Sequence, residues 1–276
     1  MTRIIEFVTN SSGEIQVILF LTTVLICWII ENLFGLATGY KKWKHAFLNS
    51  KFIAFNVPIQ LIFGVCMAIA IQWTTNHHFG ILNYLPYAKS NLVLFSASFI
   101  LFDLGEYAYH VIMHKTRRLW MFHLVHHSDP IVDVSTTVRE HPGENAIRTF
   151  FTLIWVILSG AALWMLLLRQ IIQTFTTLIS HMNYRLPPKT NRVIGWVFIT
   201  PNLHHVHHHY QQPYTDCNYG DVLSIWDRMF GTFSPEPETR IVFGVDTYMA
   251  EKEHSQYVSL LKIPFGKYRK SKPDAE

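Results

Sequence analysis

The chain has 276 residues, of which 50% are apolar and 15% are charged, a composition that fits either one large soluble domain or a small membrane protein. The net charge is +4, but the basic residues stand in short groups beside apolar runs, which argues against nucleic-acid binding. Three scattered cysteines give no support to a disulfide framework or a CxxC redox motif.

Apolar runs predict three membrane spans in the first part of the chain. Residues 15–36 form the first, which exceeds the roughly 20 residues that cross a bilayer. We expect it to remain as an anchor, because it is too long for a signal peptide and no small-residue cleavage site precedes Lys41. Residues 52–73 form the second span, and the third begins near Leu92 and ends close to His110.

The charges of the connecting loops predict the orientation of these spans. The loop after the first span carries Lys41, Lys42, Lys44 and Lys51, whereas residues 74–90 contain one basic residue, Lys89. By the positive-inside rule the first loop is cytoplasmic, so the third span returns to the cytoplasmic side and delivers its histidines there.

The third span carries two acidic residues, Asp103 and Glu106, ahead of its histidines. Acids within a span are costly and tend to be paired or functional. Asp103, Tyr107, His110 and His114 follow one another at steps of four, three and four, which places them on one helical stripe. An acid there could orient a ligand imidazole from behind, so Asp103, Glu106 and Tyr107 are catalytic candidates. The alternative is that both acids lie at the interface and are solvated.

Histidines are concentrated between residues 110 and 209, where twelve of the sixteen fall. Three clusters have helical spacing: His110 and His114; His123, His126 and His127; and His204, His207 and His208. Such spacing places imidazoles on one helix face, and neutral imidazole is a common metal ligand. Eight nitrogens exceed the four that one tetrahedral zinc accepts, so the clusters predict two metal ions. Imidazole binds iron, zinc and copper alike, so the spacing does not identify the metal.

Residues 149–181 decide whether the three clusters can meet. A single crossing would carry the third cluster to the opposite side of the membrane from the first two. We therefore predict a hairpin that turns near residues 167–170, with Arg169 at the turn and His181 back on the cytoplasmic side. Pro142 biases His141 out of a helix, and His141 is a possible further ligand, a donor behind a ligand or a structural residue.

In this order the clusters resemble the fatty acid hydroxylase and sterol desaturase superfamily of membrane di-iron proteins. The resemblance covers residues 92–233 and includes the spacing of Asp103, Tyr107 and His110, the Arg139-x-His141-Pro142 element, His181 ahead of Asn183, and Thr200-Pro201 ahead of His204. Residues 218–220 and 226–233 are most similar to the alkylglycerol monooxygenase subfamily and its bacterial relatives.

The resemblance implies an all-α, polytopic membrane protein whose cytoplasmic, histidine-rich helical cap holds a dinuclear metal site. Two iron ions would be held by the eight motif histidines, with His181 as a frequent additional ligand. His205 and His209 stand where relatives often carry arginine and serine, and they are left outside the core site. The implied domains are N-terminal transmembrane helices over residues 1–90, a catalytic domain over 91–235 and a polar C-terminal tail over 236–276.

The implied activity is hydroxylation of an unactivated C–H bond of a fatty acyl, sterol or alkylglycerol-type lipid, with O2 as the oxidant. Electrons must come from an external protein or pterin, because the chain has no flavin, haem or thiol motif of its own. Desaturation is the alternative within the superfamily. Metal transport or storage is an alternative outside it, although transport sites usually lie near the bilayer midplane. A lipid-binding protein without activity is the third reading.

Overall fold

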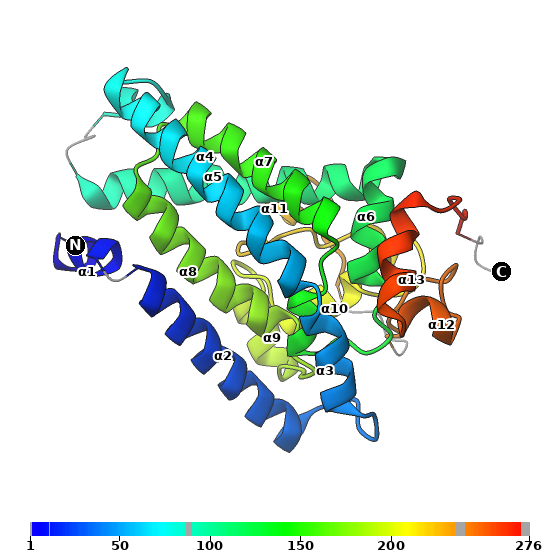
Figure 1. The fold of residues 1–276 in the computed structure, drawn as a ribbon. Coiled ribbons are helices and arrows are strands. Elements are labelled where there is room, and N and C mark those ends of the chain that lie inside the picture. Colours follow the sequence, from blue (N-terminus) through cyan, green and yellow to red (C-terminus); the bar gives the residue numbers. More distant parts are fainter. Residues whose placement is uncertain (1, 11, 87–89, 236–240, 272–276) are drawn as a thin grey trace.

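The computed structural model of the chain describes residues 2–10, 12–86, 90–235 and 241–271. These residues are mostly helical, and they include two isolated β-bridges but no β-strand. Long helices run side by side in a bundle, and most of the shorter helices gather toward one end of it (Figure 1). The all-α fold class expected from the sequence is confirmed for these residues.

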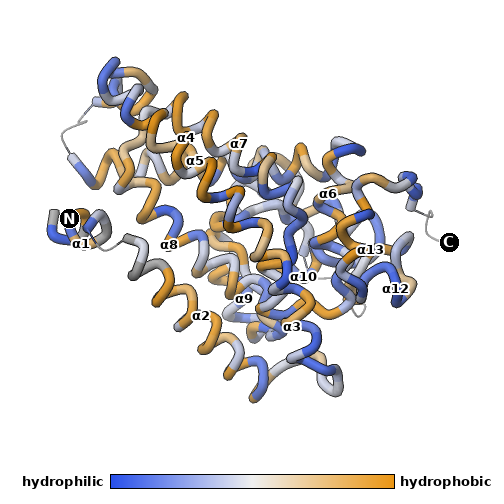
Figure 2. The backbone as a smooth tube through the Cα atoms, in the orientation of Figure 1, coloured by the Kyte–Doolittle hydropathy of each residue, from blue (hydrophilic) through white to orange (hydrophobic). Residues whose placement is uncertain are grey.

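Four helices are long and apolar enough to cross a bilayer. They are α2 (Ser12–Phe34), α4 (Ile53–Asn76), α5 (Asn91–Lys115) and α8 (Leu163–Ser180). The first three coincide with the three predicted spans. Large apolar side chains such as Leu25, Leu33 and Leu61 are exposed along them, and the hydrophobic character of the bundle is visible in Figure 2. An apolar surface of this extent fits the acyl chains of a membrane.

A helical hairpin follows the third span, as the sequence predicted. Its legs are α7 (Pro142–Ser159) and α8, of 18 residues each, which is about 27 Å of helix at 1.5 Å per residue. The predicted position of the turn was wrong, because the chain turns at residues 160–162. Gly160 ends α7 in the left-handed conformation, with φ of 68°, and a Cβ there would lie 2.3 Å from the carbonyl oxygen of Phe79.

Arg169 lies inside α8 instead of at the turn. Its guanidinium is buried, and Nη2 is 3.1 Å from Oε1 of Glu106 on α5. Arg148 of α7 approaches the other oxygen of Glu106 at 3.6 Å. A buried charge is costly unless it is paired, so this ion pair explains how an arginine enters a spanning helix. It also fastens α8 to α5.

The remaining elements are short. They are α1 (Thr2–Asn10), α3 (Lys42–Ser50), η1 (Ile81–Tyr84), α6 (Arg117–His127), η2 (Val134–Val138), α9 (Pro188–Ile194), α10 (Pro201–His207), η3 (Tyr214–Asp216), α11 (Ile225–Met229), α12 (Glu251–His254), α13 (Tyr257–Lys262) and η4 (Ile263–Phe265). Apart from α1 and η1, they lie toward the end of the bundle where α5 and α8 finish (Figure 1).

The C-terminal segment is more ordered than its polar composition suggests. Leu260 and Ile263 are buried in a core that also contains Phe52 and Leu124, so α13 and η4 cover α6. The ends of the predicted polar tail, residues 236–240 and 272–276, lie outside the described residues.

Candidate metal centre

Nine histidines meet at the end of the bundle. They come from the last turns of α5, from α6, from the C-cap of α8 and from α10 with its C-cap. They form two groups: His110, His114, His123, His127 and His207 in one, and His126, His181, His204 and His208 in the other. Within each group the nitrogens that could bind a metal lie within 4.8 Å of one another. Each group therefore has the size of a site for a single ion.

The helical spacing sorts the histidines between the two groups. In α6 the residues four apart, His123 and His127, belong to the five-histidine group, while His126 belongs to the other. In α10 the arrangement is reversed, since His204 and His208 share the four-histidine group and His207 joins the first. Both segments thus contribute to both groups, and the rings of His127 and His208 stack at 4.4 Å between centroids.

Hydrogen bonds at Nδ1 fix the orientation of five of these rings. The acceptors are the carbonyl oxygens of Tyr219 for His110 (2.9 Å), Thr177 for His181 (2.8 Å) and Cys217 for His207 (2.7 Å), and the carboxylates of Asp216 for His114 (3.2 Å) and Glu144 for His123. A carbonyl or carboxylate oxygen can only accept, so Nδ1 of each ring carries the proton. In the neutral imidazole Nε2 then presents a lone pair.

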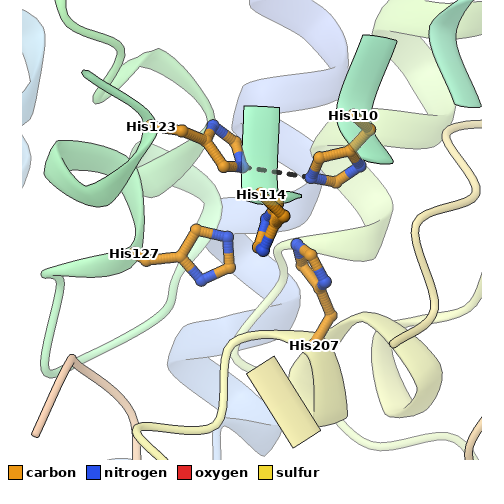
Figure 3. Close-up of side chains that lie close together, drawn as sticks. All are labelled: His110, His114, His123, His127 and His207. Carbon is orange, nitrogen blue, oxygen red and sulfur yellow. Dashed lines mark hydrogen bonds between the residues drawn. The ribbon is translucent and has the colours of Figure 1, made fainter. Parts of the chain in front are cut away.

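The Nε2 atoms converge within each group. Nε2 of His110 lies 3.0 Å from Nε2 of His123, a contact that Figure 3 marks within the five-histidine group. In the other group Nε2 of His181 lies 3.1 Å from that of His126 and 2.9 Å from that of His204. Two nitrogens that bind one ion at about 2.0–2.1 Å and at roughly right angles are about 3 Å apart. The spacing fits a shared cation, and for His110 and His123, whose Nδ1 atoms carry the protons, it would otherwise bring two lone pairs face to face.

Several imidazole nitrogens are buried away from water and from other hydrogen-bond partners. Nε2 of His114 and His207 and both nitrogens of His127 are buried without a hydrogen-bond partner. Burial away from water lowers the pKa of His181 to about 4 and that of His207 to about 3, and it holds the pKa of His126 well below its ordinary value. The rings are therefore neutral near pH 7, and unpartnered neutral imidazole nitrogens are suitable ligands for a transition metal.

The acceptors behind the rings are themselves held in place. Glu144 lies in the first turn of α7 and is buried, and Arg148 one turn later approaches it at 3.5 Å. Asp216 pairs with Lys115 at 2.7 Å. The loop that supplies the carbonyl oxygen of Tyr219 is fastened by Asp227, which accepts from the backbone N–H of Tyr219 at 2.7 Å. Such partners keep ligand rings in the orientation and tautomer that metal binding needs.

The acidic and aromatic candidates on α5 do not bond to these rings in the described part of the chain. Asp103 accepts instead from the backbone of Val222 and Leu223 and from the indole of Trp226, at 2.7–3.2 Å. Glu106 is taken up by the ion pair with Arg169, and the hydroxyl of Tyr107 bonds to Thr232 at 2.8 Å. These side chains fasten α5 to the loop beyond the third cluster and to α8.

Sequence reasoning missed the acceptors that the structure places behind the histidines. Glu144 stands 21 residues from His123 and Asp216 stands 102 residues from His114, so spacing does not link them. The available signals were an acid in the first turn of a helix that begins at Pro142 and an acid just after the third cluster. The backbone acceptors leave no signal in residue type.

Three of the twelve histidines between residues 110 and 209 lie outside both groups. His141 caps α7, accepting from the backbone N–H of Gly143 at 2.9 Å, and its Nε2 faces the carbonyl oxygen of Leu261 at 3.3 Å. His205 is buried against Phe243, and His209 accepts from the N–H of Gln211 at 3.2 Å. None of the three belongs to a group that could hold a metal among the described residues, although Nε2 of His205 is buried without a hydrogen-bond partner.

The first span also supports the centre. Glu31, buried near the end of α2, accepts from the backbone N–H of Val134 at 2.7 Å and from that of Asn183 at 2.8 Å, and it pairs with Lys42 at 2.9 Å. Val134 lies in the segment that follows α6, and Asn183 lies two residues after His181. The carboxylate of Glu31 therefore fixes two backbone segments, each of which follows a ligand histidine in the chain.

The sequence profile of the fatty acid hydroxylase family matches residues 95–232, which is half of the chain. This interval contains every histidine of the two groups.

Similar proteins act on several lipids. Alkylglycerol monooxygenase of Danio rerio is 32% identical over 152 residues, which cover 54% of this chain and 32% of the relative. Ornithine lipid hydroxylase OlsE of Rhizobium tropici is 24% identical over 258 residues, 91% of this chain and 75% of the relative. Cholesterol 25-hydroxylase of Rattus norvegicus is 27% identical over 142 residues, 51% of this chain and 47% of the relative. The chain thus spans about a third of the alkylglycerol monooxygenase. No solved structure matches the chain.

Proposed function

The chain belongs to the fatty acid hydroxylase family, and from this premise we propose that it is a membrane-bound lipid hydroxylase with two iron ions. The observation that carries the proposal is the convergence of buried imidazole nitrogens in two adjacent groups, with Nε2 of His114 and Nε2 of His207 left without a hydrogen-bond partner in the five-histidine group. The five-histidine group would hold one ion and the four-histidine group the other.

The chain's own residues set the conditions for such a centre. Bound iron would supply the power to activate O2 and insert one oxygen atom into a C–H bond, with electrons from an external donor. The nine imidazoles would hold the ions, while Glu144, Asp216 and three backbone carbonyl oxygens keep the Nδ1 protons on the outer side of five of the rings. Burial of the cluster excludes bulk water, which would otherwise consume a reactive oxidant.

A lipid is the substrate class that the position of the centre favours. Helices α5 and α8 could span a membrane, and ligand histidines stand at their ends. An acyl, alkyl or sterol chain can therefore approach the centre from the bilayer. The names of the relatives refer to alkylglycerol, ornithine lipid and cholesterol, all of which are lipids. We place the catalytic domain at residues 91–235 and the centre on the cytoplasmic side, with a reductase, cytochrome, ferredoxin or pterin as the electron donor.

The first experiment is to purify the full chain anaerobically in detergent and to measure its metal by elemental analysis and Mössbauer spectroscopy. We expect about two coupled irons per chain. Lipid mixtures supplied with O2 and a reductant should then yield products that have gained one oxygen atom. Products that have lost two hydrogen atoms would instead identify a desaturase.

A matched pair of variants tests the assignment of the ligands. His204→Gln should lose iron and activity, whereas His205→Gln, one residue away on the same helix but facing Phe243, should keep both. A folded chain with no bound metal, or equal iron in the two variants, would overturn the proposal.

A further inference from the structure

A pocket of about 550 Å³ lies between the end of α2 and the start of α3. Trp28 and Asn32 line it from α2, and Tyr40 and residues 41–44 line it from the connection and from α3. The candidate span in α2 ends at Phe34, so the pocket opens where the chain leaves the apolar part of the bundle. This is the depth at which lipid headgroups lie.

The pocket has an excess of positive charge. Lys41 and Lys44 are exposed, and neither has a carboxylate partner among the described residues. Lys42 is paired with Glu31, and the nearby Asp133 is occupied by Tyr40 at 2.6 Å and by His45 at 3.0 Å. The first turn of α3 contains no acidic residue and has no side-chain cap, so its partial positive charge adds to that of the lysines. The pocket therefore favours an anion.

Its walls are aromatic, which suits a lipid better than a free anion. The rings of Trp28 and Trp43 lie 4.7 Å apart, and Nζ of Lys42 stands 4.1 Å above the ring of Trp28. Trp43 is 78% exposed. An exposed tryptophan beside lysines at the end of a span is typical of the membrane interface, where the ring contacts the glycerol and upper acyl region.

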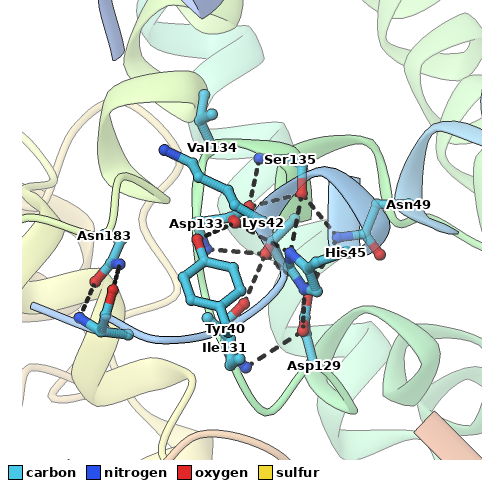
Figure 4. Close-up of polar contacts among 12 residues, drawn as sticks. Tyr40, Lys42, His45, Asn49, Asp129, Ile131, Asp133, Val134, Ser135 and Asn183 are labelled. Carbon is cyan, nitrogen blue, oxygen red and sulfur yellow. Dashed lines mark hydrogen bonds and ion pairs between the residues drawn. The ribbon is translucent and has the colours of Figure 1, made fainter. Parts of the chain in front are cut away.

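Two residues that line the pocket, Tyr40 and Lys42, belong to the polar network that Figure 4 shows. The hydroxyl of Tyr40 donates to Asp133, which is also bound by His45 and by the backbone N–H of Ser135 at 2.8 Å. Lys42 is held by Glu31 and by the side-chain oxygen of Asn32 at 3.2 Å. Lining residues that are already held in place do not have to be ordered again when a ligand binds.

We propose that this pocket binds the phosphate headgroup of an anionic phospholipid of the surrounding bilayer. Lys41 and Lys44 would contact the phosphate, and Trp28 and Trp43 would flank the glycerol. The pocket lies outside the histidine groups, and its role is independent of the metal and of the substrate.

The test is native mass spectrometry of the full chain in detergent, titrated with phosphatidylglycerol or phosphatidylcholine. We expect one phosphatidylglycerol to be retained in preference to phosphatidylcholine. Lys41→Gln/Lys44→Gln should weaken that binding by roughly tenfold or more, since each lysine near anionic lipid contributes about 1 kcal/mol. Lys252→Gln/Lys262→Gln removes the same charge from α12 and α13 and should bind as the unmodified chain does.

Trp43→Leu provides an independent variant without a change of charge, and it should also weaken phosphatidylglycerol binding. Unchanged binding in the Lys41/Lys44 variant, or an equal loss in the Lys252/Lys262 control, would overturn the proposal. Displacement of the lipid by an equal concentration of soluble glycerol phosphate would overturn the assignment to a bilayer lipid, because the headgroup alone would then suffice.

Discussion

The identity of each candidate ligand could be predicted from the sequence. Its assignment to one of the two histidine groups, and the acceptor that orients its ring, could not. Helical spacing indicated eight imidazoles, whose number indicated two ions, and the family resemblance added His181. The spacing did not show that His126 separates from His123 and His127, although consecutive residues such as His126 and His127 diverge by about 100° around a helix, which is enough to reach a second site. The carbonyl oxygens of Cys217, Tyr219 and Thr177 depend on loop and helix geometry, which residue type does not specify.

The carboxylate of Glu144 offers a direct test of this support. Glu144→Ala removes the acceptor of the His123 Nδ1 proton, and we expect iron affinity to fall by roughly 10- to 100-fold. Competition with an iron chelator measures the change. Glu140→Ala is the matched control, because Glu140 bonds to Arg148 and Asn145 and not to a ligand ring. An equal loss of iron in the two variants would contradict a specific role for Glu144.

The buried imidazoles also predict how the stability of the iron-free chain depends on pH. The folded pKa values of His181, about 4, and of His207, about 3, lie below the unfolded value near 6.5. Between these limits the unfolded chain binds more protons, so the free energy of unfolding decreases as the pH falls below about 6.5. Each group contributes about 1.4 kcal/mol per pH unit.

Thermal unfolding of iron-free protein in detergent, followed from pH 7.5 to 5, measures this dependence. We expect a nearly constant midpoint above pH 7, a decline below pH 6.5, and a shallower decline in His207→Gln. A midpoint that rises on acidification would show that the rings are charged in the folded chain.

At the scale of the elements, the spans and the existence of the hairpin were predictable, and the position of its turn was not. The prediction placed the turn at residues 167–170 because an arginine is unfavourable inside a span. The structure resolves that conflict with Glu106 on another helix, which no local pattern in residues 149–181 reveals. The overlooked local signal was Gly160, a residue suited to end a helix in the left-handed conformation.

The geometry of the turn predicts that replacing Gly160 lowers the thermal stability, whereas replacing Gly64, which lies outside the turn, does not. Gly160→Ala places a Cβ within 2.3 Å of the carbonyl oxygen of Phe79 at a φ of 68°, so we expect the thermal midpoint to fall by several degrees. Gly64→Ala, in α4, meets nothing within 4 Å and should leave the midpoint unchanged or raise it. Similar midpoints for the two variants would show that the turn relaxes without cost.

At the scale of the whole molecule, the two histidine groups require that α7 and α8 leave and re-enter the same side of the membrane. The residues after α8 must then lie on the same side of the membrane as α12. The loop between α4 and α5 must lie on the opposite side of the membrane. The positive-inside rule predicts that the first of these sides is the cytoplasmic one.

Cysteine labelling in a Cys66→Ser background tests the arrangement. A membrane-impermeant reagent applied to sealed vesicles should modify Lys189→Cys and Lys252→Cys from one side, and Tyr84→Cys, at an 81% exposed position, from the other. Labelling of Lys189→Cys and Tyr84→Cys from the same side would exclude the hairpin.

The ion pair between Glu106 and Arg169 has a consequence for how the chain is inserted during synthesis. An arginine near the middle of a span costs about 2.5–3.5 kcal/mol in translocon-mediated insertion, and α8 is only moderately apolar. We expect α8 to enter the bilayer poorly in a reporter that contains it alone, and efficiently when α5 precedes it or when Arg169 is replaced by leucine. If α8 inserts equally well in all three reporters, the pair does not contribute to assembly. If α8 inserts efficiently only after α5, then α5 must already be in the membrane when α8 is synthesised. Assembly of the metal centre would then depend on the order in which the two helices are made.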